Sequence, residues 1–379
     1  MPSDGRRGWG VTTIDLSDPG PILAEPVSPA PTSAPVGAPV ETRHAYAALD
    51  LGTNNCRLLV ARPHSERTRN GSDGFRIIDA FSRIVRLGEG LGHSGELEEA
   101  AIARTLDALA VCRDKMEQRG VTRARLIATE ACRIASNGSE FIDRVRDALG
   151  LDLEIIDGET EARLAALGCA ALADPRAEGV LIFDIGGGSS ELIWLDPART
   201  VSASMGRPHI RLWTSLQIGV VSLAEQFGGV DVSSAVYETM VSHVAHALDA
   251  FLRRAKLQRH CSRFHLLGTS GTVTTIAGVH LALPRYDRRR VDGLWMSAGD
   301  VSATIARLRA MSYDERAAHG CIGPARADLV LAGCAILEAI RRAFPAPRLR
   351  IADRGLREGI LIELMRADGV WDRQAETVA

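Results

Sequence analysis

The first strong pattern in the chain is an apolar strand, a polar turn and a second apolar strand. Residues 46–52 (Tyr-Ala-Ala-Leu-Asp-Leu-Gly) predict a buried strand that ends in a turn, and residues 57–61 predict the return strand. The polar residues 52–55 between them predict the tip of a hairpin. The aspartate in this unit lies at the end of the first strand.

A second unit with the same order lies near the middle of the chain. Residues 179–184 predict an apolar strand, residues 185–190 (Ile-Gly-Gly-Gly-Ser-Ser) a turn, and residues 191–195 a return strand. Here too the first strand ends in an aspartate and the turn consists of small residues. Two such units far apart in one chain predict two similar α/β domains that face a cleft.

The other periodicities complete this two-domain plan. Further strands are predicted at 75–86, 125–129, 153–156, 263–268 and 349–352, and helices at 96–119, 139–149, 159–173, within 222–259, and at 301–310, 329–344 and from 356. We expect a first domain at residues 44–164, joined by a C-terminal helix at 356–370, and a second domain at 165–355. A length of 379 residues agrees with two domains.

Composition separates the first 43 residues from the rest. Pro, Ala, Ser and Val dominate residues 19–39, and few large apolar side chains are present, so residues 1–43 are predicted to be a disordered tail. The net charge of −2 gives no overall attraction to nucleic acid or membrane. Basic clusters at 253–259 and 285–290 would either guide a polyanion or form solvated faces. Aromatic residues are only 4% of the chain, which disfavours nucleic-acid binding.

The seven cysteines are scattered and form no Cys-x-x-Cys motif, which argues against a disulfide framework or a zinc site. Reduced, buried thiols are typical of a cytoplasmic protein. The N-terminus lacks an apolar segment behind its arginines, and no apolar stretch is long enough to span a bilayer. We therefore expect a cytoplasmic protein without a membrane partner.

The two turns carry the candidate chemistry. A phosphate chain needs backbone N–H groups that approach closely, which requires glycine or small residues, and it needs acids nearby that hold Mg²⁺. Asp50 with the turn at 52–55 meets this description, and so does Asp184 with the turn at 186–190. Either motif alone is also typical of an ordinary turn, but two in matching contexts predict a phosphate site.

These residues resemble a known family. Residues 48–55 (Ala-Leu-Asp-Leu-Gly-Thr-Asn-Asn) and 183–191 (Phe-Asp-Ile-Gly-Gly-Gly-Ser-Ser-Glu) look like the two phosphate loops of the actin-like superfamily, whose domains are ribonuclease H-like. Within it they resemble the exopolyphosphatase and guanosine-pentaphosphate phosphohydrolase family. Further similar segments are 86–91, 128–137, 157–164, 268–272 and 353–359.

The resemblance implies a role for each matching residue. Glu161 falls at the position of the catalytic base, with Glu159 as its competitor, and Arg133 at that of an arginine that neutralises phosphate oxygens. Asp184 and Glu191 match residues tied to metal binding and catalysis, and Asp50 matches an acid that contacts Mg²⁺. The implied substrate-binding residues are Thr53, Asn54, Asn55, Arg86, Gly186, Gly187, Gly188, Ser189, Ser190, Gly268, Ser270, Gly271 and Thr272.

The resemblance implies a Mg²⁺-dependent exopolyphosphatase that removes the terminal phosphate of polyphosphate. The alternatives are a guanosine-pentaphosphate phosphohydrolase, an actin-like ATPase or kinase, and a non-catalytic polyphosphate sensor. Two departures from the family bear on this: the first loop reads Thr53-Asn54-Asn55-Cys56, and the chain ends at Ala379 without the HD-type domain of long members. A buried strand thiol is the expected state of Cys56. Homodimer formation is an expectation from the family alone.

Overall fold

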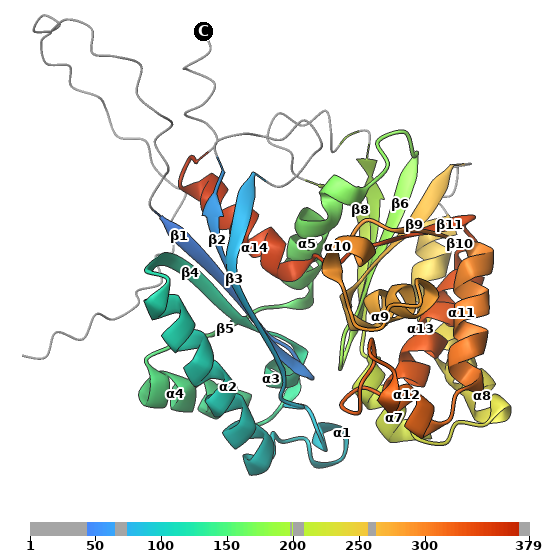
Figure 1. Ribbon diagram of the computed structural model, residues 1–379, viewed down its shortest axis with the longest axis horizontal. Helices are drawn as coiled ribbons and strands as arrows, with labels where there is room; N and C mark the ends of the chain where they lie inside the picture. Colours follow the sequence, from blue (N-terminus) through green and yellow to red (C-terminus); the bar gives the residue numbers. More distant parts are fainter. Residues whose placement is uncertain (1–43, 65–73, 198, 200–207, 257–262, 371–379) are drawn as a thin grey trace, which may run out of the picture.

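The computed structural model describes residues 44–64, 74–197, 199, 208–256 and 263–370. They form two α/β halves, each built on one sheet (Figure 1). The tail predicted at residues 1–43 lies outside the described residues. None of the helices in the described part of the chain is long and apolar enough to cross a membrane.

The first sheet has the strand order β3-β2-β1-β4-β5. Strands β1, β2 and β3 are antiparallel neighbours, while β4 and β5 continue the sheet in parallel from β1. The strands are β1 (Ala45–Leu51), β2 (Asn55–Pro63), β3 (Phe75–Ile84), β4 (Val121–Ala128) and β5 (Glu154–Ile155).

The second sheet repeats this plan and adds one strand. Its order is β10-β11-β9-β6-β7-β8, so the antiparallel run β6-β7-β8 corresponds to β1-β2-β3, and β9 and β11 correspond to β4 and β5. The strands are β6 (Gly179–Ile185), β7 (Ser190–Asp196), β8 (His209–Leu216), β9 (Phe264–Thr269), β10 (Trp295–Ser297) and β11 (Arg348–Ile351). The predicted duplication of two α/β domains is therefore confirmed.

Helices cover the outer face of each sheet. Leu109 of α2 and Phe141 of α4 pack on the side of β1 that carries Leu49, and helices α8, α9, α11 and α13 join the large core on β6. The helices are α1 (Leu91–Ser94), α2 (Glu99–Gln118), α3 (Glu130–Ile134), α4 (Gly138–Leu149), α5 (Gly158–Cys169), α7 (Val220–Phe227), α8 (Ser234–Lys256), α9 (Ser270–His280), α10 (Arg288–Val291), α11 (Ala298–Ala310), α12 (Tyr313–Ala318), α13 (Val330–Ala343) and α14 (Leu356–Ala367).

Helices α5 and α14 lie between the two sheets and join them (Figure 1). They approach so closely that a Cβ atom on Gly168 would be 1.9 Å from the Gly355 carbonyl oxygen, and one on Gly359 would be 2.0 Å from that of Leu164. Glycine is needed at this crossing because any side chain would separate the helices. The proposed domain boundary at residue 164 falls within α5, which continues through it, so the boundary stays a prediction.

Most elements agree with the sequence, and the exceptions are short or lie at an edge. Helix α2 begins at Glu99 rather than at 96, and the helix expected at 159–173 ends at Cys169 before a 3-10 turn. Strand β8 was not predicted, because most of its residues are only half-buried and its apolar pattern is weak. The short elements α1, α3, α10, α12 and β10 were also missed.

Candidate active site

A cleft of about 140 Å³ lies between the two halves, at the turns that follow β1, β6 and β9. Most of the residues expected at a phosphate site line it, although they come from distant parts of the chain. The predicted residues in its wall are Asp50, Thr53, Asn54, Asn55, Glu161, Asp184, Gly186, Gly187, Gly188, Ser189, Glu191, Ser270, Gly271 and Thr272. Ser190 and Gly268 lie next to these residues in the chain but are not in the wall.

The two hairpin turns have the same backbone form. The Gly52 N–H donates to the Asn55 carbonyl at 2.9 Å, and the Gly186 N–H donates to the Ser189 carbonyl at the same distance. The turns also touch each other: a Cβ atom on Gly188 would be 2.7 Å from Thr53 Oγ1. The glycine run is therefore required for the close approach of the two turns, and it leaves backbone N–H groups accessible to a ligand.

The aspartates that end β1 and β6 have different neighbours across their hairpins. Asp50 pairs in register with Arg57, whereas Asp184 pairs with Glu191. Burial raises the pKa of Asp50, and the charge of Arg57 opposes this shift. Burial also raises the pKa of Asp184 to about 6. The acid pair at β6 and β7 therefore places two poorly compensated carboxylates in the second half of the cleft.

Burial, followed by the charge of Asp184, raises the pKa of Glu191 to about 7. The hydroxyl groups of Ser189 and Ser215 both donate to Glu191 Oε1 at 2.8 Å, and these bonds favour the charged form. Glu191 is almost completely buried, so the two donors fix one of its oxygens. Ser215 was not found from the sequence, because it lies on the unpredicted strand β8.

Glu161 lies in the first turn of α5, whose N-terminus is capped by Asp157 through the Thr160 N–H. Burial and the nearby Glu191 raise the pKa of Glu161 well above its usual value. Its competitor Glu159 is exposed and does not line the cleft. Of the two glutamates, only Glu161 is therefore placed where it can reach a bound phosphate.

Arg133 is held by acids and a carbonyl group. Its Nη1 donates to the Ile156 carbonyl at 2.6 Å and to Glu161 at 3.3 Å, and its Nη2 donates to Glu130. Glu130, which the sequence reading did not single out, has a side chain only 3% exposed and lines the cleft beside Gly188. Arg133 thus bridges two buried carboxylates, and its predicted contact with phosphate stays a prediction.

Three of the arginines that line the cleft, which Arg133 does not, have no such partners. In the described part of the chain, Arg57, Arg326 and Arg357 make no hydrogen bond or ion pair through their side chains. Burial lowers the pKa of Arg326 and of Arg357, which shows how little water surrounds these charges. The sequence reading missed all three. Two of them had a local signal: Arg57 lies two residues after the first turn, and Arg357 lies in the similar segment 353–359.

The duplicated fold, the paired turns and the acids together match a known family. Residues 66–368 match the Ppx/GppA phosphatase family. The chain belongs to this family. Exopolyphosphatase 2 of Mycobacterium tuberculosis is 27% identical over 328 residues, which cover 84% of this chain and 98% of that protein.

Two further relatives show the range of the Ppx/GppA family. A guanosine-5'-triphosphate,3'-diphosphate pyrophosphatase of Aeromonas hydrophila is 28% identical over 323 residues, which are 84% of this chain and 59% of that protein. The crystal structure of an exopolyphosphatase from Cytophaga hutchinsonii has a TM-score of 0.75 and 25% identity, covering 86% of this chain and 98% of that one. The chain is therefore a hydrolase of phosphoanhydride bonds, with the two-sheet α/β fold that the two hairpins predicted.

The acids of this Ppx/GppA protein fit a divalent cation that shares its coordination with substrate. Asp50, Asp184 and Glu191 provide carboxylate oxygens in one cleft, and burial raises the pKa of each, which a bound cation would oppose. No three Asp, Glu, His or Cys side chains in the described ranges converge on one complete metal site. Mg²⁺ commonly takes only one or two carboxylates and completes its shell with water and phosphate oxygens.

Arg86 lies outside the cleft wall, with a carboxylate partner of its own. Its backbone has a positive φ of 49°, and its Nη2 lies 3.0 Å from Asp328 Oδ2, across the two halves. Nearby, the Gly90 N–H donates to Glu225 at 3.1 Å. These contacts tie the loop after β3 to the second half. The predicted phosphate contact of Arg86 stays a prediction.

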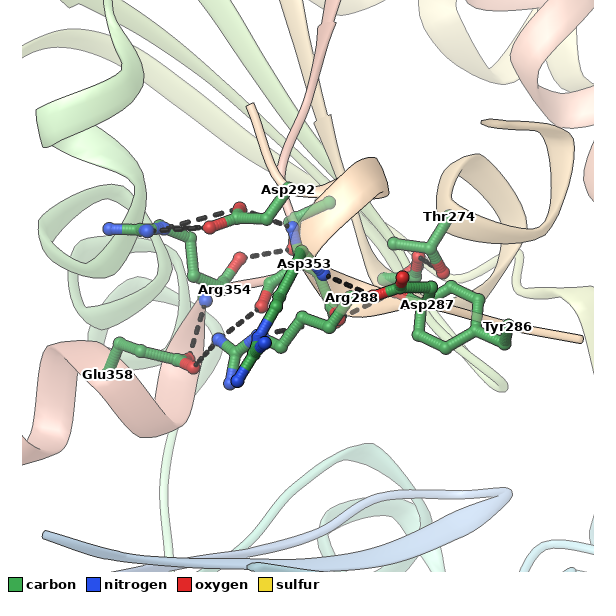
Figure 2. Close-up of polar contacts among 12 residues, drawn as sticks. Thr274, Tyr286, Asp287, Arg288, Asp292, Asp353, Arg354 and Glu358 are labelled. Atoms are coloured by element: carbon green, nitrogen blue, oxygen red, sulfur yellow. Dashed lines mark hydrogen bonds and ion pairs between the residues drawn. The ribbon is translucent and has the colours of Figure 1, made fainter. Parts of the chain in front are cut away.

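A polar network closes the far end of the cleft, where the chain passes from β11 to α14 (Figure 2). Arg354 pairs with Asp292 at 2.6 Å, and Arg288 donates to Glu358 at 2.8 Å. Asp353, which lines the cleft, accepts a hydrogen bond from the Tyr286 hydroxyl at 2.6 Å. The network fixes the start of α14 and with it the position of Arg357.

Proposed function

We propose that this protein is an exopolyphosphatase that removes the terminal phosphate of inorganic polyphosphate in the presence of Mg²⁺. The observation that carries the proposal is the cleft itself: two matched turns with accessible N–H groups, buried acids, and three arginines without carboxylate partners. Such arginines are suited to phosphate oxygens, because a guanidinium group binds them with two parallel hydrogen bonds.

In the proposed mechanism, the turns at 52–55 and 186–189 bind the terminal phosphates through their N–H groups. Arg57, Arg326 and Arg357 offset the negative charge of the chain. Glu161 orients a water molecule and accepts its proton as the water oxygen attacks the terminal phosphorus. The bond between this phosphorus and the bridging oxygen breaks, and the shortened chain leaves with the bridging oxygen.

We assign Asp50, Asp184 and Glu191 to Mg²⁺, whose role when bound is to neutralise charge on the phosphate oxygens. Burial and the charge of Glu191 raise the pKa of Glu161, so its carboxylate is more basic than that of an exposed glutamate. Arg133 and Glu130 hold Glu161 in place from the side of α3. In this assignment Arg133 acts first as a support for the base.

A second candidate substrate is guanosine pentaphosphate. It is favoured by the similarity to the Aeromonas hydrophila protein named for that class of substrate. An actin-like ATPase or a non-catalytic sensor is less well supported, because the cleft has the three acids and Glu161 in place. A cytoplasmic location and a homodimer remain predictions from the sequence.

The test measures phosphate release by the purified protein with Mg²⁺ from polyphosphate, guanosine pentaphosphate and ATP in separate reactions. We expect release from polyphosphate, and we expect Glu161→Gln to lower kcat by about 10²- to 10⁴-fold, the usual contribution of a positioned base. Glu159→Gln is the matched control and should keep near-normal activity. If no substrate yields phosphate, the hydrolase proposal is wrong; if the Glu161 variant keeps full activity, the base is wrongly assigned.

A further inference from the structure

A short basic segment lies beside the cleft and has no part in the mechanism above. Residues 285–290 (Arg-Tyr-Asp-Arg-Arg-Arg), here named the arginine loop, comprise the end of the connection after α9 and the first three residues of α10, and they line a surface hollow with residues 283 and 284. In Figure 1, α10 lies at the junction of the two halves, between α5 and α9. The loop therefore lies near the junction of the two halves, where the cleft also lies.

The charges of the arginine loop are mostly uncompensated. Arg285, Arg289 and Arg290 are exposed, and their side chains make no hydrogen bond or ion pair with any other described residue. Arg288 differs, since it contacts Glu358 and the Asp353 carbonyl. The one acid of the loop, Asp287, accepts a hydrogen bond from the Arg289 backbone N–H. Three positive charges and one negative charge thus leave a local excess of positive charge on a protein whose net charge is −2.

The loop is connected to the cleft through Asp353. The Tyr286 hydroxyl donates to its carboxylate at 2.6 Å, and Arg288 Nη2 donates to its carbonyl at the same distance. Figure 2 shows Tyr286 and Arg288 reaching Asp353 from the same short segment. Because Asp353 lines the cleft and Tyr286 and Arg288 line the hollow, these hydrogen bonds join the two walls.

The cations in the cleft continue toward the loop. A Cβ atom on Gly271 would be 3.9 Å from Arg57 Nη2 and 4.0 Å from Arg326 Nη1, so these two arginines lie on either side of one point in the cleft wall. Arg326 is also within electrostatic range of Tyr286 and Asp353. Arg57 and Arg326 therefore lie close together in the cleft wall, and Arg326 lies on the side of the cleft that Tyr286 of the arginine loop approaches.

We propose that the arginine loop binds the distal phosphates of a long polyphosphate chain whose terminal phosphate lies between the two turns. This inference rests on the proposed function and narrows its substrate class. A long chain carries charge along its whole length and can reach both sites at once, which raises its affinity. Tripolyphosphate ends within the cleft, and guanosine pentaphosphate carries a nucleoside where the long chain carries further phosphates. The loop thus selects for long polyphosphate.

The experiment compares two matched double variants. Arg289→Gln with Arg290→Gln removes two charges from the arginine loop, and Arg253→Gln with Arg254→Gln removes two exposed charges from the other basic cluster, at the end of α8. We expect the loop variant to raise the KM for long-chain polyphosphate by about fivefold, as two exposed charge contacts would give, with kcat unchanged. The KM for tripolyphosphate should stay the same, and added salt should reduce the difference between the substrates.

A binding measurement separates this inference from the proposed activity. The same two pairs are introduced into the Glu161→Gln protein, and the Kd for fluorescently labelled long-chain polyphosphate and for tripolyphosphate is measured without turnover. If the parent protein hydrolyses nothing, the proposed function fails while this measurement still tests the loop. The inference is overturned if the loop pair raises the Kd for both substrates equally, or if it leaves both Kd values unchanged. It is also overturned if the α8 pair has the same effect as the loop pair.

Discussion

The two hairpins that face the cleft have the same backbone and different chemistry. In the first hairpin, Asp50 is paired with Arg57, and the turn carries the polar side chains Thr53 to Asn55. In the second, Asp184 is paired with Glu191, and the turn carries three glycines. Besides Asp50, the first hairpin therefore has an arginine and side-chain amides that can bind phosphate. The second hairpin has two acids and a turn of glycines whose backbone is not covered by side chains. In the proposed mechanism the two hairpins share the Mg²⁺ ligands, Asp50 on the first and Asp184 with Glu191 on the second, and only the first adds an arginine for phosphate.

The second turn has less room for an added side chain than the first. The Gly187 and Gly188 backbone lies against Thr53 and Asn54, whereas a Cβ atom on Gly52 would have its nearest neighbour at 3.7 Å. The room for a side chain therefore differs between the turns, although their hydrogen bonds are the same. Substitutions at matching positions should have unequal effects.

Among substitutions in the two hairpins, Gly188→Ala has the largest expected effect. The added methyl group would meet Thr53 Oγ1 and push the two turns apart, and a displacement of about 1 Å in a catalytic site can lower the rate about 10²-fold. We expect kcat/KM for polyphosphate to fall by about that factor, measured by phosphate release. Gly52→Ala is the matched control and should stay within about threefold of the parent protein, since its Cβ atom has room. Equal losses in both variants would show that the turns do not differ in this way.

The next prediction compares Glu191 with Arg57, the residues opposite the two aspartates in their hairpins. Glu191→Gln should raise the Mg²⁺ concentration for half-maximal activity by about tenfold or more, because it removes a charged oxygen ligand. Arg57→Gln should instead raise the KM for polyphosphate by about tenfold with the Mg²⁺ requirement unchanged, because it removes a phosphate contact.

Both parameters are obtained from phosphate release measured over a grid of Mg²⁺ and substrate concentrations. Arg57→Lys serves as a control that keeps the charge but not the two-pronged geometry, and it should recover part of the lost affinity. If either Gln variant shifts both parameters together, Glu191 and Arg57 do not have separate tasks.

The smallest expected effect is a change with pH in the free energy of unfolding of the metal-free protein. Asp184 and Glu191 have raised pKa values in the folded state, about 6 and about 7, so folding favours their protonated forms. Their contribution to the free energy of unfolding is therefore largest below about pH 4 and is lost as the pH rises through 6 to 7. We expect a loss of about 1 kcal/mol for this pair, because water in the cleft weakens the repulsion.

This loss is measured by denaturant unfolding between pH 5 and pH 8 in the presence of a chelator. Asp184→Asn should flatten the pH dependence, and Mg²⁺ should oppose the loss of stability at pH 8. A metal-free protein that is equally stable at both values would contradict the assignment of an uncompensated acid pair to the second half.

The features predicted correctly from the sequence are those that depend on one continuous segment of the chain. Both hairpins, their aspartates and the glycine run were predicted, since an apolar strand, a small-residue turn and a return strand have local backbone requirements. The long helices α2, α8 and α13 were found for the same reason. Strand β8 was missed because its stability comes from pairing with β7, and with it the Ser215 hydroxyl bond to Glu191 was missed.

The sequence by itself thus determined the duplicated α/β plan, the two phosphate turns and most of the acids around them. The tertiary structure alone decided which charges meet: Arg326 and Arg357 join Arg57 in the cleft, Arg133 lies between Glu130 and Glu161, and Arg86 pairs with Asp328. The physical reason is that strand and turn formation depend on neighbouring residues, while electrostatic partners depend on distances between elements far apart in the chain.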